Sequence, residues 1–261
     1  MSEHSIETLI ENGVCWLRLN RPEVFNSFNR EMALRLQDQL DGASADDSVR
    51  AIVITGNGKA FCAGQDLKEV TTPDLNPGFK KILEEHYNPI VKRIRTIEKP
   101  IIAAVNGVAA GAGANIALAC DVVVASEAAS FIQAFSKIGL VPDSGGTFFL
   151  PRLIGFQKAS ALAMLGDKVS AADAEAMGMV YKVFAVDDFA TAVEKLAVTL
   201  AQMPTQALGY TKRMLNASLT NDLNAQLDLE SELQIASAQS EDYAEGVQAF
   251  IEKRKPNFKG R

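Results

Sequence analysis

Two glycine-containing segments place backbone N–H groups where an anionic group could bind. The first, Gly56–Asp66, follows an apolar run, and its glycines permit tight turns that expose backbone amides. The alternative for this segment is a plain structural loop. The second, Ile101–Gly113, passes from apolar residues into small ones and then into a predicted helix, so a ligand can approach its backbone closely.

A third segment holds a carboxylate between a proline and two glycines. This is Asp143, within Gly139–Thr147. In an apolar pocket, desolvation raises the pKa of a carboxyl group and makes it a usable general base. The alternative is a turn residue or a helix cap, because Asp is common in both.

Several other chemistries are disfavoured by what these segments lack. Lys59 has neither the preceding GxxxxG nor the following Ser or Thr of a Walker motif, and Ile116 stands where a dinucleotide fingerprint requires its third glycine. The only histidines are His4 and His86, so a Ser-His-Asp triad or a histidine-rich metal site is hard to assemble. Ser144 does not lie in a GxSxG motif.

The composition is that of an ordinary globular protein. The 261 residues are 48% hydrophobic and 22% charged, which argues against disorder and suits one large domain or a domain with an appendage. The 26 basic and 32 acidic residues give a net charge of −6, so no global positive field attracts nucleic acid or anionic lipid. No apolar signal segment, membrane span or CxxC motif is present in the sequence. We expect a cytoplasmic protein that binds neither nucleic acid nor membranes.

Alternating helix and strand patterns must position the three segments. Asn12-Gly13 predicts a hairpin turn, Asn29 a helix cap, and Ser170 with Asp173 a capping box. Repeated alternation of helix and strand implies right-handed crossovers and largely parallel sheets, so the predicted fold class is α/β. The predicted elements are a hairpin at 5–19, a helix from 30, a strand at 51–55, a helix at 79–97, a strand at 101–105, a helix at 113–120, a strand at 122–125, a helix after 170 and a strand at 179–184.

Only helical patterns remain after about residue 187. They cover 188–203, 205–217 and 221–240, and they predict a helical C-terminal appendage. The chain ends in two basic runs, at 253–255 and 259–261. We expect a solvated terminus there, with a phosphate contact as the alternative.

Together these segments resemble the crotonase (enoyl-CoA hydratase/isomerase) superfamily over nearly the whole chain. The resemblance implies a spiral of ββα units over residues 1–200 and a C-terminal helical region over 201–261 that packs homotrimers, commonly paired into homohexamers. The residues that carry it are Asn20–Pro22, Lys59–Asp66, Lys99–Gly113 with Cys120-Asp121, Gly139–Thr147 and Glu245–Pro256.

The resemblance also implies a site for an acyl-CoA thioester. The backbone N–H groups of Gln65 and Ala112 are expected to form an oxyanion hole for the thioester carbonyl, which would stabilise an enolate. Phe250 and Lys253 of a neighbouring subunit are expected to complete the CoA site. The other residues expected to contact the substrate or its CoA are Ala63, Gly64, Asp66, Leu67, Lys68, Tyr87, Gly111, Asn115 and Phe135.

Three positions favour isomerisation over hydration. Family members that add water carry two glutamates, and the resemblance places Asn115 and Phe135 at those positions. Asp143 falls where the isomerases carry a single carboxylate base, which removes a proton from one carbon and returns it two carbons along. The resemblance thus implies an isomerase that needs no metal and no cofactor other than the CoA of its substrate. Asn115 is expected to be a pocket residue or to make a structural hydrogen bond.

Within the family, the pattern is most similar to isomerases that convert the ring 1,2-epoxide of phenylacetyl-CoA to an oxepin-CoA in aerobic phenylacetate degradation. Phe135 and Tyr87 suit a pocket for a ring, with helix packing as the equal alternative. Other possibilities are a Δ3,Δ2-enoyl-CoA isomerase or an enoyl-CoA hydratase of fatty-acid oxidation, a non-catalytic acyl-CoA-binding subunit, and a nicotinamide oxidoreductase. The carriers of this narrower resemblance are Gly64–Leu67, His86–Pro89, Asn106–Gly113, Phe135–Lys137 and Val141–Asp143.

Overall fold

The computed structural model describes residues 4–261, and its first element is the predicted hairpin. Strands β1 (Ile6–Glu11) and β2 (Val14–Leu19) pair antiparallel in register. Asn12 and Gly13 between them have φ of 53° and 77°, as a type I′ turn requires. The prediction of an antiparallel start is confirmed.

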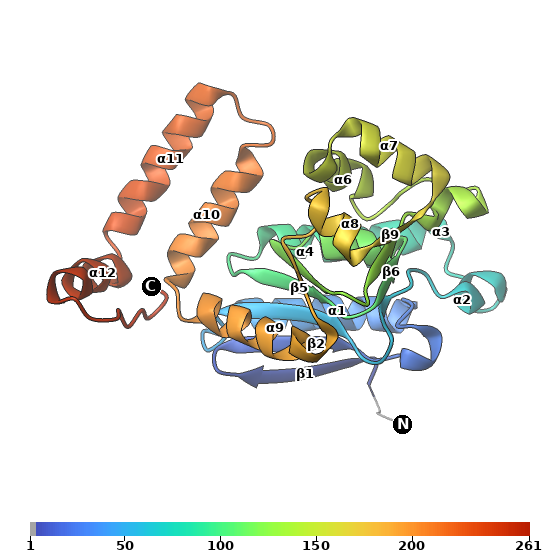
Figure 1. Ribbon diagram of the computed structural model, residues 1–261, viewed down its shortest axis with the longest axis horizontal. Helices are drawn as coiled ribbons and strands as arrows, with labels where there is room; N and C mark the ends of the chain where they lie inside the picture. Colours follow the sequence, from blue (N-terminus) through green and yellow to red (C-terminus); the bar gives the residue numbers. More distant parts are fainter. Residues whose placement is uncertain (1–3) are drawn as a thin grey trace.

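The hairpin forms the edge of a six-stranded sheet in the order β1-β2-β3-β5-β7-β10 (Figure 1). Every pair after the hairpin is parallel, which confirms the predicted α/β class. The inner strands are almost wholly buried because helices cover both faces of the sheet. The most deeply buried are β3 (Ala51–Gly56), β5 (Ile101–Val105) and β7 (Val122–Ser126). Strand β10 (Lys182–Phe184) forms the edge opposite the hairpin and is exposed or half-buried.

A second sheet of four strands was not predicted. Its order is β4-β6-β8-β9, and each of its first three strands follows a strand of the larger sheet after a short turn. The chain therefore winds as a spiral whose turn contains one strand of each sheet and usually a helix. Each strand of this second sheet has only three residues, which are too few to show a hydrophobic period in the sequence. The strands are β4 (Ala60–Cys62), β6 (Val108–Ala110), β8 (Ser130–Ile132) and β9 (Lys168–Ser170).

The four helices predicted for the spiral begin within one residue of the expected positions. Asn29 and Ser170 cap their helices through side-chain bonds to Met32 N and Asp173 N. The predicted helix at 79–97 is continuous, but its central turn is π-helical. The helices of the spiral are η1 (Pro22–Val24), α1 (Arg30–Ala45), α2 (Leu67–Thr71), α3 (Phe79–Lys81), the π-turn η2 (Ile82–Tyr87), α4 (Asn88–Thr96), α5 (Ala112–Leu118), η3 (Ala134–Ile138), α6 (Gly146–Ile154), α7 (Phe156–Leu165) and α8 (Ala171–Ala176). Of these, η1, α2, η3, α6 and α7 were not predicted.

The strand predicted at 179–184 is shorter than expected. Gly178 leaves helix α8 with φ of 81°, and Met179 N still donates to Ala174 O. The chain first bonds to the sheet when Tyr181 N donates to Val123 O. Only Lys182–Phe184 therefore form the strand.

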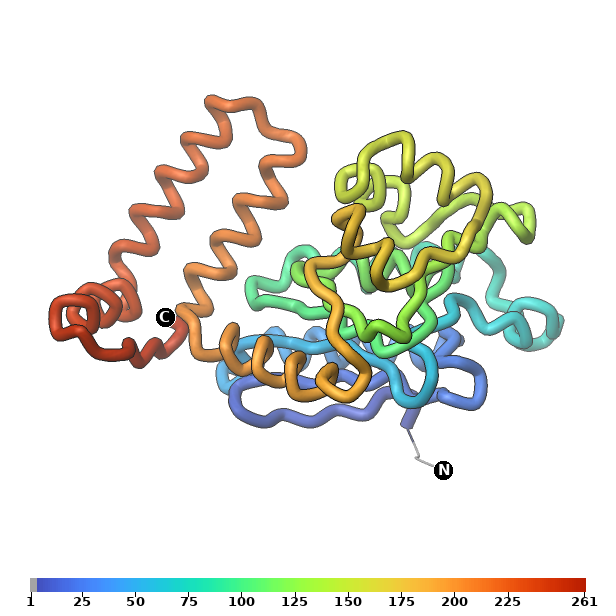
Figure 2. The backbone as a smooth tube through the Cα atoms, in the orientation of Figure 1, coloured from blue at the N-terminus to red at the C-terminus, as the bar shows by residue number. Residues whose placement is uncertain are grey.

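The C-terminal helices separate into two groups. Helix α9 (Val186–Ala201) packs on the outer face of the larger sheet, whereas α10 (Thr205–Ala217) and α11 (Leu223–Ala238) extend away from it (Figure 1 and Figure 2). The predicted division between residues 200 and 201 lies one residue before the end of α9 and stays a prediction. Helix α12 (Glu241–Glu252), which Ser240 caps, was not predicted.

The basic terminus is more ordered than a solvated tail. Its lysine side chains are exposed, as expected, but Arg254 forms ion pairs with Glu245 and Glu252 at 2.6 Å each. The Asp242 carboxylate accepts the backbone N–H groups of residues 259 and 260 at 2.5 and 2.7 Å. These bonds return the end of the chain to the start of α12. Across residues 4–261, no helix is long and apolar enough to cross a membrane.

Candidate active site

One cavity of about 450 Å³ gathers most of the predicted site residues. It lies between the segment after β4, the start of α5 and the excursion that follows β8. The predicted residues that line it are Ala63, Gly64, Gln65, Asp66, Leu67, Lys68, Tyr87, Gly111, Ala112, Phe135 and Asp143. Three segments that are far apart in the sequence therefore meet at one place.

The backbone after β4 turns an N–H group toward this cavity. Phe28 pairs with residue 65 as a parallel bridge: Phe28 N donates to Gly64 O at 2.7 Å, and Asp66 N donates to Phe28 O at 2.8 Å. The intervening N–H of Gln65 faces the other way and has no acceptor among residues 4–261. Gly64 has φ of 94°, which side-chain-bearing residues rarely adopt.

A second free N–H group lies at the start of α5. Gly111 bonds to β8, and the next residue, Ala112, begins the helix, so its N–H has no intrahelical acceptor, nor any other partner within the described chain. A Cβ atom on Gly64 would lie 3.6 Å from Ala112 N. The same Cβ atom would lie only 3.0 Å from Ala110 O, so the two segments are in close approach and the site, with its positive φ, favours glycine.

A second glycine, Gly113, allows α5 to pack closely on β4. A Cβ atom on Gly113 would lie 2.3 Å from Cys62 O, so α5 rests directly on β4. Asp66 secures the neighbouring turn through an ion pair with Arg21 at 2.7 Å and a bond from Lys68 N at 2.9 Å. The positions of both amides are therefore set by backbone packing.

Asp143 presents a carboxyl group to the same cavity. Burial raises its pKa from 3.8 to about 6, and the hydroxyl of Ser144, which donates to Oδ1 at 2.9 Å, partly opposes the increase in pKa. At neutral pH, which is about one unit above this pKa, most of the carboxyl groups are ionised. A carboxylate in that state can both accept and return a proton.

The side chain of Gln65 is held by a series of partly buried hydrogen bonds. Tyr87 donates its hydroxyl to Gln65 Oε1 at 2.6 Å, and Gln65 Nε2 donates to Glu69 at 2.7 Å. Glu69 in turn accepts Arg30 N at 2.7 Å. Burial raises the pKa of Tyr87 well above 10, so the phenol stays a donor. Phe28 packs edge-on against its ring at 5.9 Å.

Some predicted residues lie outside this cavity. Asn115 is fully buried and is not among the residues that line this cavity. Its side-chain amide bonds to Asp143 O and Gln133, which agrees with the second expectation, a structural hydrogen bond. Phe250 and Lys253 lie at the end of α12, well away from the cavity within one chain (Figure 1). Their predicted contact with CoA across a subunit boundary stays a prediction.

The sequence did not reveal the rest of the lining. Lys137 joins Lys68 as an exposed cation there, and apolar side chains from two further elements complete the wall. Lys137 follows Phe135 by two residues in η3, a short helix that no sequence pattern indicated. The additional lining residues are Val24, Ser27, Phe79, Ile82, Ala134, Ile138 and Leu140.

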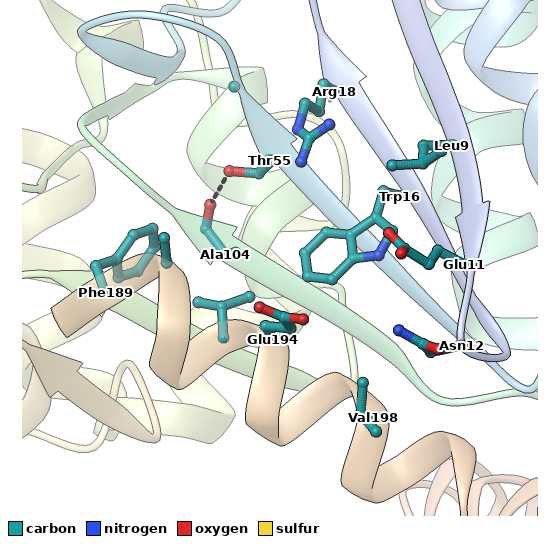
Figure 3. A pocket seen from close by; sticks show the side chains of 13 residues that line it. Leu9, Glu11, Asn12, Trp16, Arg18, Thr55, Ala104, Phe189, Glu194 and Val198 are labelled. Carbon is teal, nitrogen blue, oxygen red and sulfur yellow. Dashed lines mark hydrogen bonds between the residues drawn. The ribbon is translucent and has the colours of Figure 1, made fainter.

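A different hollow, of about 350 Å³, lies on the outer side of the larger sheet. Figure 3 shows it between the hairpin and α9, with Trp16 and Glu194 among its side chains and Thr55 bonded to Ala104 O at 2.7 Å. None of the predicted site residues lines it. The cavity around Asp143 is therefore the candidate active site.

Comparisons with known proteins agree with this geometry. The family model described as enoyl-CoA hydratase/isomerase matches residues 9–261. A 1,2-epoxyphenylacetyl-CoA isomerase from Escherichia coli strain K12 is 46% identical over 254 residues, which cover 97% of both chains. A protein named probable enoyl-CoA hydratase from Rhodobacter capsulatus is 45% identical over 100% of both chains.

Solved structures agree as well. The crystal structure of enoyl-CoA hydratase from Bacillus anthracis has a TM-score of 0.92 to this chain at 31% identity, and the match covers 99% of this chain and 100% of that one. The spiral fold expected from the sequence is thus confirmed. The chain belongs to the enoyl-CoA hydratase/isomerase family.

Proposed function

We propose that this enzyme is an acyl-CoA isomerase in which Asp143 moves a proton between two carbons of the acyl group. The observation that carries the proposal is the state of the carboxyl groups in the cavity. Asp66 is ion-paired with Arg21, whereas the carboxyl group of Asp143 is half-buried and has no cationic partner in the described part of the chain. It accepts hydrogen bonds only from the Ser144 hydroxyl and its own backbone N–H, and it faces the same cavity as two free backbone N–H groups.

In the first step, Asp143 accepts a proton from the carbon next to the thioester carbonyl. The C–H electron pair moves toward the carbonyl oxygen and forms an enolate, which accepts hydrogen bonds from the N–H groups of Gln65 and Ala112. One such donor contributes about 3 to 4 kcal/mol to the transition state of comparable reactions. In the second step, Asp143 returns the proton two carbons along, and the double bond becomes conjugated with the thioester.

The reaction leaves oxidation states unchanged, so the proton shift requires neither a redox cofactor nor a metal. Addition of water is less well supported, because it needs an acid and a base that act on different atoms. The positions where the family resemblance expects the two hydratase glutamates hold buried Asn115 and apolar Phe135. We therefore favour isomerisation over the hydratase activity named for the Rhodobacter relative.

For the substrate we propose the 1,2-epoxide of phenylacetyl-CoA. An arene epoxide and its oxepin are valence tautomers, and the oxepin carries an acidic CH2 between the thioester and a ring double bond. The same 1,3-proton shift then yields a conjugated product. The name of the 46% identical relative and the presence of the aromatic residues Phe135 and Tyr87 in the cavity lining support this choice. Lys68 and Lys137 would suit the CoA phosphates.

We further propose a homotrimer or homohexamer in the cytoplasm, as the family resemblance implies. In such an assembly Phe250, which is 85% exposed in one chain, would be covered by a neighbouring subunit. A monomer would leave Phe250 in water together with Tyr243, Val247 and Ile251 of the same helix, and exposed apolar groups of this kind are typical of interaction surfaces.

The test is proton NMR of a 3-enoyl-CoA and of the ring epoxide in deuterated water. We expect double-bond migration with deuterium exchange for the wild type and neither for Asp143→Asn. Asp222→Asn is the matched control, because Asn caps a helix as well as the Asp that begins α11. An active Asp143→Asn variant refutes the proton shuttle. Tight binding of both esters without exchange by the wild type establishes a non-catalytic binding subunit instead.

A further inference from the structure

Asn115 connects the proposed base to the helix that carries one of the free N–H groups. It is fully buried and lies one turn beyond Ala112 in α5. Its Nδ2 donates to the backbone oxygen of Asp143 at 2.9 Å, and its Oδ1 accepts from Gln133 Nε2 at 2.8 Å. One side chain thus bridges two segments that line the cavity.

The direction of these bonds is fixed by the backbone. A carbonyl oxygen only accepts, so the Asn115 NH2 group must face Asp143 O, and its oxygen must face Gln133. Gln133 then has to present its own NH2 group. Its Oε1 is left buried without a donor among residues 4–261. Since buried acceptors without donors are rare in native proteins, the orientation of Asn115 is retained at a cost to the fold.

The segment that Asn115 holds is backbone-strained. Ser144 has φ of 50° and Gly145 of 76°, so two consecutive residues after the base are left-handed. Asp143 O also accepts Gly146 N at 2.8 Å. A Cβ atom on Gly146 would lie 2.2 Å from Asn115 Nδ2, so the side-chain amide of Asn115 packs directly against the first turn of α6.

We propose that Asn115 is a positioning residue that fixes the carboxylate of Asp143 relative to the N–H group of Ala112, and that Gln133 orients Asn115 for this purpose. The inference rests on the proposed function. Because Asn115 and Ala112 belong to the same short helix, a shift of the Asp143 segment away from Asn115 changes the distance between the base and the oxyanion donor directly. Small displacements of this kind have large effects on rate.

The test compares Asn115→Ala and Gln133→Leu with the control Asn106→Ala. The side chain of Asn106 also bonds to backbone groups, accepting from Gly56 N and donating to Gly58 O, but it makes no hydrogen bond to Asp143. For Asn115→Ala we expect kcat to fall about ten- to a hundredfold with KM changed less than about threefold. Gln133→Leu should show a smaller fall in kcat, and Asn106→Ala should lose stability with kcat unchanged.

A pH titration of the Asp143 carboxyl group tests this inference separately from the proposed function. Titration of 13C-labelled Asp143, assigned by subtraction of Asp143→Asn, needs no turnover. In Asn115→Ala the Asp143 segment should be less tightly held, so water reaches the carboxyl group and its pKa moves from about 6 toward its ordinary value. Asn106→Ala should leave this pKa unchanged. If Asn115→Ala lowers stability alone and leaves both the titration and kcat as in the wild type, Asn115 is merely structural. An inactive wild type with the expected titration refutes only the proposed reaction.

Discussion

Replacing Asp143 by Asn should stabilise the protein while it removes the activity. Burial disfavours the charged form of this carboxyl group, so its pKa in the folded protein is about 6 instead of 3.8. The gap of about two pH units corresponds to about 3 kcal/mol of unfolding free energy, at about 1.4 kcal/mol per unit. The folded wild type is less stable by this amount when the group is ionised.

The pH range of the effect follows from the direction of the pKa change. The folded protein holds this proton more tightly than the unfolded chain, so the contribution of Asp143 to stability is full below about pH 4 and is lost as pH rises through about 6. The Asn side chain does not ionise. The advantage of Asp143→Asn over the wild type should therefore grow from about zero at pH 4 to about 3 kcal/mol at pH 8.

Urea unfolding at pH 4, 6 and 8, at one protein concentration, measures this difference. Asp66→Asn is the matched control: its carboxylate is ion-paired with Arg21 and caps α2, so the same substitution should lower stability at pH 8. The activity of Asp143→Asn should fall by about 10² to 10⁴. Equal stability of the wild type and Asp143→Asn at pH 8 would show that the carboxyl group is not desolvated, and the reasoning would fail.

Three further substitutions test other parts of the site. Ser144→Ala removes the hydroxyl that bonds to Asp143, so the acid limb of the pH profile of kcat/KM should move upward by about one pH unit, and an unchanged limb would contradict this. Gly64→Ala should lower kcat/KM about a hundredfold or more by crowding the free amides, whereas Gly78→Ala, at a similar positive φ in open space, should lower stability only. Tyr87→Phe removes the donor to half-buried Gln65 Oε1 and should reduce the unfolding free energy by about 1 kcal/mol in urea, with an unchanged midpoint as the contrary result.

Local sequence signals predicted the larger sheet and its helices well. The Asn12-Gly13 turn, the Asn29 cap and the apolar runs of the inner strands each specify their own conformation over a few residues. The family resemblance then brought Gln65, Ala112 and Asp143 to one cavity, where the structure places them. Their expected roles await the experiments above.

Features that depend on contacts between distant segments could not be predicted. The strands of the second sheet are three residues long, and only pairing with one another defines them. Asn115 lies in a stretch of small residues where its buried partners, Asp143 O and Gln133, are 28 and 18 residues away. No local pattern distinguishes such a buried amide from one that lines a pocket.

The walls of the cavity come from two different parts of the fold. The two free amides belong to the spiral itself, where Gly64 and Gly113 leave no space for a side chain. Asp143 and Phe135 come instead from the excursion between β8 and β9, which pairs with the sheets only at its ends. Substitutions of side chains in that excursion would therefore change the carboxyl group and the apolar wall of the cavity while the two backbone amides keep their places. The cavity thus combines a fixed half, made of backbone, with a variable half, made of side chains.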